Sequence, residues 1–189
     1  MEEKQTAQGI FNKKMDFFFK YFPARIKNVG QDAVAARELI WAFKDCRDNA
    51  DEKVAELTAS RIKEEYGNDV DNMIFVCVPP SKKDNYVSRF KTFCDEVSRL
   101  TGIENGFPHI VVMQSRPAVH EHRRGKKKCD VSPSVVDYDA KFFKGKKVLV
   151  FDDVVTTGKS FARFANELEQ KGAEVVGGMF IGKTFYKYV

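Results

Sequence analysis

A stretch near the C-terminus, FDDVVTTGKS from Phe151 to Ser160, combines acidic, hydroxylated and basic side chains within ten residues. Its last three residues, Gly-Lys-Ser, also end the Walker A loop that binds nucleoside triphosphates. That loop needs a glycine five residues before the Gly-Lys pair, so that backbone N–H groups can surround a chain of phosphates. Asp153 holds this position, and its carboxylate would repel the phosphates. The spacing therefore argues against a triphosphate loop.

The same stretch predicts a site for one phosphate beside two carboxylates. Residues 147–151 predict a strand, Asp152 and Asp153 follow it, and residues 161–171 have the spacing of an amphipathic helix. The small hydroxylated residues before this helix lie where free N–H groups and the positive end of the helix dipole favour an anion. The carboxylates can accept hydrogen bonds from hydroxyl groups or hold a metal, although aspartates also commonly cap helices. Ribose 5-phosphate, with a phosphate at one end and a diol nearby, would fit both halves.

The rest of the chain predicts a sheet that positions this stretch. Short, uninterrupted apolar runs are typical of strands buried on both faces of a parallel sheet, and they cover residues 73–78, 109–113, 147–151 and 174–181. Helical spacing covers residues 32–66, with a break near 45–49, then 86–100 and 161–171. This alternation predicts an α/β fold, doubly wound, with a mainly parallel sheet and helices on both faces. The aromatic cluster in residues 17–23 is expected to pack an N-terminal segment onto the body.

Length and composition predict one domain in a reducing compartment. At 189 residues the chain is long enough for a real core, with residues 1–70 as an N-terminal helical hood and 71–189 as the core of the same domain. The polar beginning is unlike a secretion signal, and no apolar run approaches the roughly 20 residues of a membrane span. The four cysteines form no CxxC pair, which favours reduced thiols and a cytoplasmic location. The net charge of +5 suits an anionic ligand without demanding nucleic acid.

Three polar loops follow strands of the predicted sheet, over residues 79–85, 114–134 and 152–160. Ligands of such sheets bind beyond the carboxyl ends of the strands, at a topological switch point. The loop over residues 114–134 is long enough to serve as a lid. Its basic run, Arg123–Lys128, can also be a solvated face or a nucleic-acid patch.

Residues 148–160 resemble the phosphoribosyl pyrophosphate (PRPP) motif of type I phosphoribosyltransferases at every position. The resemblance extends more loosely over residues 39–184. Within this superfamily the likeness is closest to the ComF-like, amidophosphoribosyltransferase-related group, through residues 39–44 and 76–81. ComF-like proteins often begin with a four-cysteine zinc module, which this sequence lacks. Its absence weakens the case for a role in DNA uptake.

The resemblance implies a role for each part of the site. Asp152 and Asp153 would be the catalytic pair that binds the ribose hydroxyls. The 5-phosphate would be held by Val155, Thr156, Thr157, Gly158, Lys159 and Ser160. The pyrophosphate loop would be Pro80, Ser81, Lys82 and Lys83. The flexible lid would contribute Arg123, Arg124 and Lys126. Mg²⁺ is the implied cofactor, held mainly through PRPP, with Asp152 and Asp153 as further candidate ligands.

The function implied by the resemblance is Mg²⁺-dependent transfer of ribose 5-phosphate from PRPP to a nitrogenous base or amine, with release of pyrophosphate. The acceptor is expected between the segment after residues 179–181 and the N-terminal hood. A different class of function stays open: a non-catalytic PRPP sensor, a nucleic-acid-binding regulator acting through Arg123–Lys128, or a ComF-like competence protein. A homodimer without membrane contact is the expected assembly.

Overall fold

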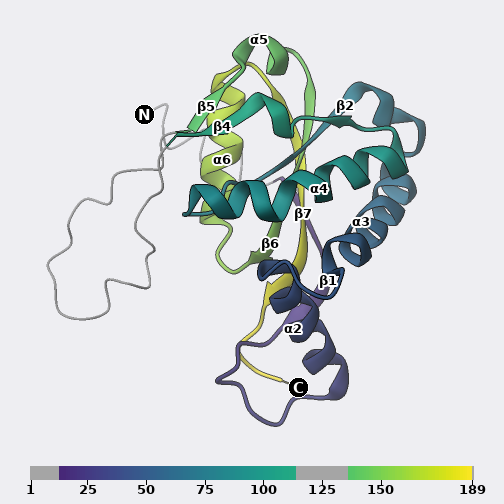
Figure 1. Cartoon of the computed structure of the whole chain (residues 1–189), viewed down its shortest axis with the longest axis vertical. Helices are drawn as coiled ribbons and strands as arrows, with labels where there is room; N and C mark the ends of the chain where they lie inside the picture. Colours follow the sequence, from purple (N-terminus) through teal and green to yellow (C-terminus); the bar gives the residue numbers. More distant parts are fainter. Residues whose placement is uncertain (1–12, 114–135, 189) are drawn as a thin grey trace, which may run out of the picture.

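A five-stranded parallel sheet forms the centre of the computed structural model, which describes residues 13–113 and 136–188 (Figure 1). The order of its strands is β1-β7-β6-β2-β3. Their bounds are Lys14–Tyr21 for β1, Met73–Cys77 for β2, Glu104–Asn105 for β3, Lys147–Val155 for β6 and Glu174–Thr184 for β7. A separate antiparallel pair joins β4 (Ile110–Val112) to β5 (Val136–Tyr138).

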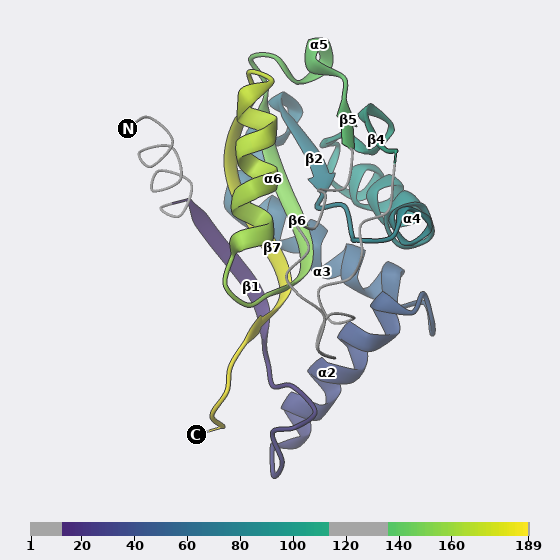
Figure 2. The ribbon, with the colours of Figure 1, turned by 90° about the vertical axis from the view of Figure 1, so that its left-hand side faces the viewer.

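Helices cover both faces of this sheet, as the sequence predicts. They are α2 (Gln31–Lys44), α3 (Ala50–Tyr66), α4 (Lys83–Thr101), α5 (Ala140–Phe143) and α6 (Lys159–Gln170), with short 3₁₀ helices at Gly67–Asn72 (η1) and Phe107–His109 (η2). Helix α6 lies on one face, and α2 and α4 lie on the other (Figure 2). Phe151 of β6 packs against Phe43 of α2 and Phe93 of α4. On the opposite face, Phe180 of β7 packs against Phe161 of α6.

The predicted break between the first two helices and the predicted stop after α6 are confirmed, and the backbone explains both. The break expected near residues 45–49 separates α2 from α3, where Cys46, Asp48 and Asn49 all have positive φ. Such left-handed residues cannot continue a right-handed helix. Gly172, with φ of 86°, lies just beyond the end of α6. In the described part of the chain, no helix combines the length and apolar character needed to cross a membrane.

One strand prediction is wrong, and one strand was not predicted. The run at residues 109–113 is not a buried strand of the parallel sheet, because β4 pairs with β5 and Val111 is 47% exposed. Its place beside β2 is taken by the two-residue strand β3. The aromatic segment before Phe22 is itself a strand, β1, which runs parallel to β7 and adds an edge to the sheet. Three consecutive phenylalanines lack the alternation that marks a strand packed on one face.

Strand β6 is longer than predicted, so both aspartates lie within it. It pairs with β7 as far as Val155, which lies opposite Lys183. On its other side β6 pairs with β2, and the helices that follow these two strands, α6 and α4, cover opposite faces. The carboxyl ends of β2 and β6 therefore form the topological switch point of the sheet, where ligands bind in such folds.

Candidate functional site

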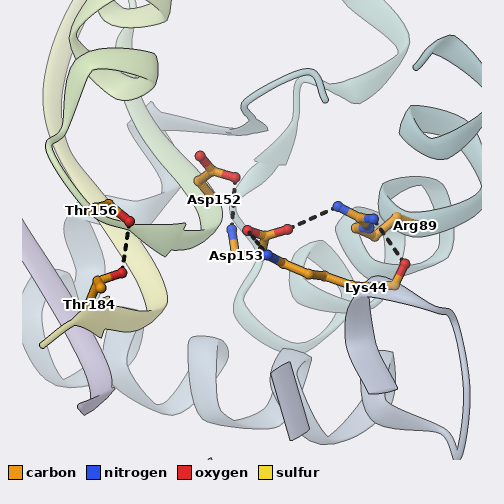
Figure 3. Close-up of polar contacts among 6 residues, drawn as sticks. All are labelled: Lys44, Arg89, Asp152, Asp153, Thr156 and Thr184. Atoms are coloured by element: carbon orange, nitrogen blue, oxygen red, sulfur yellow. Dashed lines mark hydrogen bonds and ion pairs between the residues drawn. The ribbon is translucent and has the colours of Figure 1, made fainter. Parts of the chain in front are cut away.

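The side chains of Asp152 and Asp153 leave β6 in different directions. Consecutive residues of a strand point to opposite faces. Asp153 is directed towards α2 and α4, whereas Asp152 points away from these helices (Figure 3). Asp152 lines a pocket with the start of α6, and Asp153 does not. The two adjacent carboxylates therefore have separate surroundings.

The pocket beside Asp152, called here the α6 pocket, has a volume of about 140 Å³. It is lined by Asp152, Val154, Val155, Thr156, Thr157, Gly158, Lys159, Ser160, Phe161 and Phe180. These residues include every one predicted to bind the 5-phosphate. Lys159 is exposed and is the first residue of α6. A helix start leaves its first N–H groups without intrahelical partners, so the pocket offers donors to an anion.

Two features fix the loop that closes the α6 pocket. Gly158 precedes the helix in the left-handed conformation, with φ of 74°, which favours a residue without a side chain. The hydroxyl Oγ1 of Thr156 lies 2.7 Å from Oγ1 of Thr184 at the end of β7 (Figure 3). The loop is thus tied to the neighbouring strand rather than only to its own helix.

The surroundings of Asp152 suppress the ionisation of its carboxyl group. Its Oδ1 accepts a bond of 2.8 Å from the backbone N–H of Asp153. Removal of the carboxyl from water raises the pKa of Asp152 to about 8, and the negative charge of Asp153 adds to this rise. The Asp153 N–H and the cations Lys44 and Arg89 act in the opposite direction. A donor such as a sugar hydroxyl would stabilise the ionised form.

Asp153 is buried, with 9% of its surface exposed, and is neutralised by two cations. Nη1 of Arg89 donates to Oδ2 of Asp153 over 2.9 Å, and Nζ of Lys44 lies 3.3 Å from Oδ1. Arg89 also donates through Nη2 to the backbone carbonyl of Lys44 over 2.9 Å (Figure 3). This cluster joins β6, α4 and the C-terminal end of α2.

The predicted pyrophosphate loop lies at the same edge of the sheet. The N–H of Val78, just after β2, donates to the carbonyl of Phe151 over 2.8 Å, so the loop begins beside the aspartates. Pro80 and Ser81 are half-buried, and the exposed Lys82 and Lys83 stand at the start of α4. The predicted lid residues, Arg123, Arg124 and Lys126, lie outside the described residues.

Sequence reasoning missed Lys44, Arg89 and Thr184 as parts of the site. Arg89 carried a detectable signal, because it lies three residues after Tyr86 and four before Phe93, on the apolar side of its helix. A charged residue in an apolar stripe needs a buried partner. Lys44 and Thr184 carry no comparable signal, since their partners come from distant parts of the chain.

A second, larger cavity lies where the acceptor is expected. Its volume is about 780 Å³, and aromatic residues from both ends of the described chain line it together with α2. These aromatic residues are Phe18, Phe19, Phe22, Phe185 and Tyr188. We call it the aromatic cavity. Lys20, Lys187 and Asp32 supply its charged groups. Phe185 directly follows Thr184, so the end of β7 connects this cavity to the α6 pocket.

The described residues could hold a magnesium ion only together with a bound ligand. Among residues 13–113 and 136–188, no group of three or more His, Cys, Asp or Glu side chains could hold a metal by itself. Mg²⁺ is usually bound through one or two carboxylates together with substrate phosphates and water. Asp152, which lines the α6 pocket, could supply one such carboxylate.

Comparisons with known proteins include a similarity in sequence to an orotate phosphoribosyltransferase. The chain is 30% identical over 114 residues to the orotate phosphoribosyltransferase of Fusobacterium nucleatum subsp. nucleatum. The aligned stretch covers 57% of this chain and 52% of that protein, so the chain spans about half the length of this curated relative. No protein-family model matches the chain.

Comparisons with solved structures give similarities at low identity. A hypoxanthine-guanine-xanthine phosphoribosyltransferase is 16% identical, with a TM-score of 0.36 over 74% of this chain and 71% of that chain. A phosphoribosyltransferase from Corynebacterium diphtheriae is 18% identical, with a TM-score of 0.41 over 80% of this chain and 96% of that chain.

Proposed function

We propose that this chain is a type I phosphoribosyltransferase that binds PRPP and transfers its ribose 5-phosphate to a nitrogenous base or amine. One observation carries the proposal: the α6 pocket combines the carboxyl of Asp152 with the N-terminal end of α6. Its volume of about 140 Å³ is below the roughly 300–1,000 Å³ of pockets for drug-sized ligands. That size suits one phosphate and the adjoining edge of a sugar. The partial similarity to an orotate phosphoribosyltransferase supports the same reaction class.

The chain's own residues would bind and orient the donor substrate. The N–H groups at the start of α6 and the hydroxyls of Thr156 and Thr157 would hold the 5-phosphate. Asp152 would accept a hydrogen bond from a ribose hydroxyl. Pyrophosphate would lie towards Lys82 and Lys83, whose charges favour the leaving group.

The reaction breaks the bond between the anomeric carbon and a pyrophosphate oxygen and forms a bond from that carbon to the acceptor nitrogen. The bonding pair leaves with pyrophosphate, where negative charge grows, and the acceptor nitrogen releases its proton to water. Mg²⁺ bound with PRPP would supply further stabilisation of this charge.

No covalent nucleophile is needed, and Cys77, the buried thiol nearest the loop after β2, has its pKa raised by burial. A thiol in that state is a poor nucleophile.

The acceptor would enter through the aromatic cavity, whose walls suit a planar base better than an aliphatic amine. Aromatic rings stack on flat ligands with favourable offset or edge contacts. Lys20 and Lys187 add positive charge to the same cavity. A closer placement within the ComF-like group is part of this proposal and rests on residues 39–44 and 76–81.

Pyrophosphate release from PRPP and Mg²⁺, measured with a panel of purine bases, pyrimidine bases and amines, tests the proposal. The protein should release pyrophosphate with at least one acceptor, and the Asp152→Asn variant should lose most of that rate. Asp69→Asn is a matched control, because Asp69 is exposed in η1, which precedes β2 at the other end of the sheet. Equal rates in the wild-type protein and Asp152→Asn would contradict the proposed role of this carboxyl.

A further inference from the structure

The charges around Asp153 make it a poor direct ligand for a sugar. Its carboxylate is held by Arg89 and Lys44, and the Arg89 side chain is only 11% exposed. If Asp153 turned to a ligand, it would leave the guanidinium of Arg89 buried without its carboxylate partner. Breaking such a pair on one side is strongly unfavourable, because an uncompensated charge remains away from water.

The direction of the side chain leads to the same conclusion. Asp152 lines the α6 pocket, whereas Asp153 lies on the face of α2 and α4 (Figure 3). The backbone of Asp153 nevertheless reaches the site, since its N–H donates to Oδ1 of Asp152 over 2.8 Å. Fixing the Asp153 side chain therefore fixes the donor that orients the Asp152 carboxyl.

We propose that Asp153, Arg89 and Lys44 form a positioning cluster, and that Asp152 alone presents a carboxyl to the sugar. This departs from the resemblance, which implies that both aspartates bind the ribose hydroxyls. The inference rests on the proposed function, because it assigns roles within the same ribose-phosphate site. Arg89 is the central member, since it contacts both Asp153 and the backbone carbonyl of Lys44.

The cluster also sets the spacing between the two halves of the site. Arg89 lies on α4, which begins at Lys83 directly after the proposed pyrophosphate loop. Its bond to Asp153 ties this helix to β6, and its bond to Lys44 ties both to the end of α2. Loss of Arg89 would shift the pyrophosphate loop relative to Asp152. It would lower the affinity of the site for every ligand without changing which hydroxyls are recognised.

The test uses calorimetry with ribose 5-phosphate and its 2-deoxy and 3-deoxy analogues as probes. A hydroxyl bonded to a carboxylate should give the wild-type protein a preference on the order of tenfold or more over at least one deoxy analogue. Asp152→Asn should abolish that preference. Asp153→Asn should lower the affinity for all three probes by a similar factor and keep the preference for ribose 5-phosphate. A purely structural role would not produce this split between affinity and preference.

Variants of Arg89 separate positioning from simple loss of stability. Arg89→Gln should behave as Asp153→Asn does, and Arg89→Lys should recover part of the affinity. The double variant Asp153→Asn/Arg89→Gln removes both charges of the buried pair, and the cation that remains, Lys44, has a side chain that is 36% exposed to water. It should therefore bind no more weakly than either single variant and serves if Arg89→Gln does not fold. Unfolding midpoints show that each protein is folded at the temperature of the titration.

The outcomes that overturn the two proposals differ. If Asp153→Asn lost the hydroxyl preference as completely as Asp152→Asn does, Asp153 would be a direct ligand. That result would overturn the positioning cluster but not the proposed function. Unchanged affinity in Asp153→Asn and Arg89→Gln would reduce the cluster to a structural role and overturn it as well. A wild-type protein without any preference would overturn the role given to Asp152. Failure of the wild-type protein to bind ribose 5-phosphate or PRPP would overturn the proposed function itself.

Discussion

The hydroxyls of Thr156 and Thr184 lie 2.7 Å apart and join the loop of the α6 pocket to the end of β7. Thr184 directly precedes Phe185, which lines the aromatic cavity. This single contact therefore connects the proposed donor and acceptor sites. Because the two hydroxyls are exposed, the bond contributes little to global stability, and its value lies in holding the loop.

Replacing Thr184 by valine should lower the affinity for ribose 5-phosphate and have a smaller effect on the free energy of unfolding. The lost hydrogen bond corresponds to about 1 kcal/mol, or roughly a fivefold change in affinity if the loop is fully released. Thr92→Val is the matched control, since Thr92 is exposed and bonds Asp51 across α3 and α4. Calorimetry and urea unfolding check both variants. Equal losses of affinity in the two would show that the loop does not depend on Thr184.

Gly158→Ala should destabilise the protein and also abolish phosphate binding. A side chain in the left-handed conformation costs roughly 1–2 kcal/mol, and a backbone shift that relieves this strain would move the N–H groups at the start of α6. Gly145→Ala is the matched control, because Gly145 has φ of 75°, close to the 74° of Gly158, and open space around it. Both variants should lose similar stability in urea unfolding. Retained phosphate binding in Gly158→Ala would contradict the assignment of the phosphate site.

The raised pKa of Asp152 predicts a distinct pH dependence of stability. Its pKa of about 8 in the folded protein lies above the ordinary value near 4, so the folded state binds a proton more tightly than the unfolded state. The contribution of Asp152 to the free energy of unfolding is therefore fully present below about pH 4. It is lost as pH rises towards 8, by at most about 1.4 kcal/mol per pH unit. Asp152→Asn should remove this slope. Unfolding midpoints at several pH values measure the difference between the two proteins.

Ionisation of Asp152 also controls ligand binding. As pH rises, binding should become tighter, whereas stability should fall. Only an ionised Asp152 has full capacity to accept from sugar hydroxyls. The affinity for ribose 5-phosphate should therefore increase as pH rises from 7 to 9, and Asp152→Asn should show no such increase. An identical pH profile in both proteins would place the titrating group elsewhere.

Phe185→Ala tests the aromatic cavity as the acceptor site. The variant removes one wall of the cavity and leaves the α6 pocket residues in place. Pyrophosphate release should show a higher KM for the acceptor, while calorimetry should show unchanged binding of ribose 5-phosphate. Val111→Ala is a control for loss of an apolar side chain, since Val111 is exposed on β4 and lines neither cavity. An unchanged acceptor KM in Phe185→Ala would exclude this wall from acceptor binding.

The local half of the site could be predicted because its signals are local. A strand, small hydroxylated residues and a helix start follow one another within residues 147–160, and the structure gathers Asp152 and Thr156–Ser160 around one pocket. The remaining geometry of the site depends on which strands pair and over what length. Strand β6 continues through Asp153 because β7 offers partners as far as Lys183. No periodicity within β6 reveals the length of its neighbour.

The partners of Asp153 illustrate the same limit. The sequence indicates that a buried carboxylate needs compensation, but Lys44 and Arg89 come from two helices far away in the chain. Likewise, an apolar run at residues 110–112 does not reveal whether its partner is β2 or β5. Local propensity fixes an element, while packing of distant elements decides its neighbours.

Calorimetry tests the ribose-phosphate site itself, with PRPP titrated in the presence and absence of Mg²⁺ into the wild-type protein, Asp152→Asn and the control Asp69→Asn. We predict that the wild-type protein and the control bind PRPP more tightly with Mg²⁺, and that Asp152→Asn loses at least about tenfold in affinity. Equal affinity in all three folded proteins, or no binding by the wild-type protein, would contradict a ribose-phosphate site built on Asp152 and the start of α6.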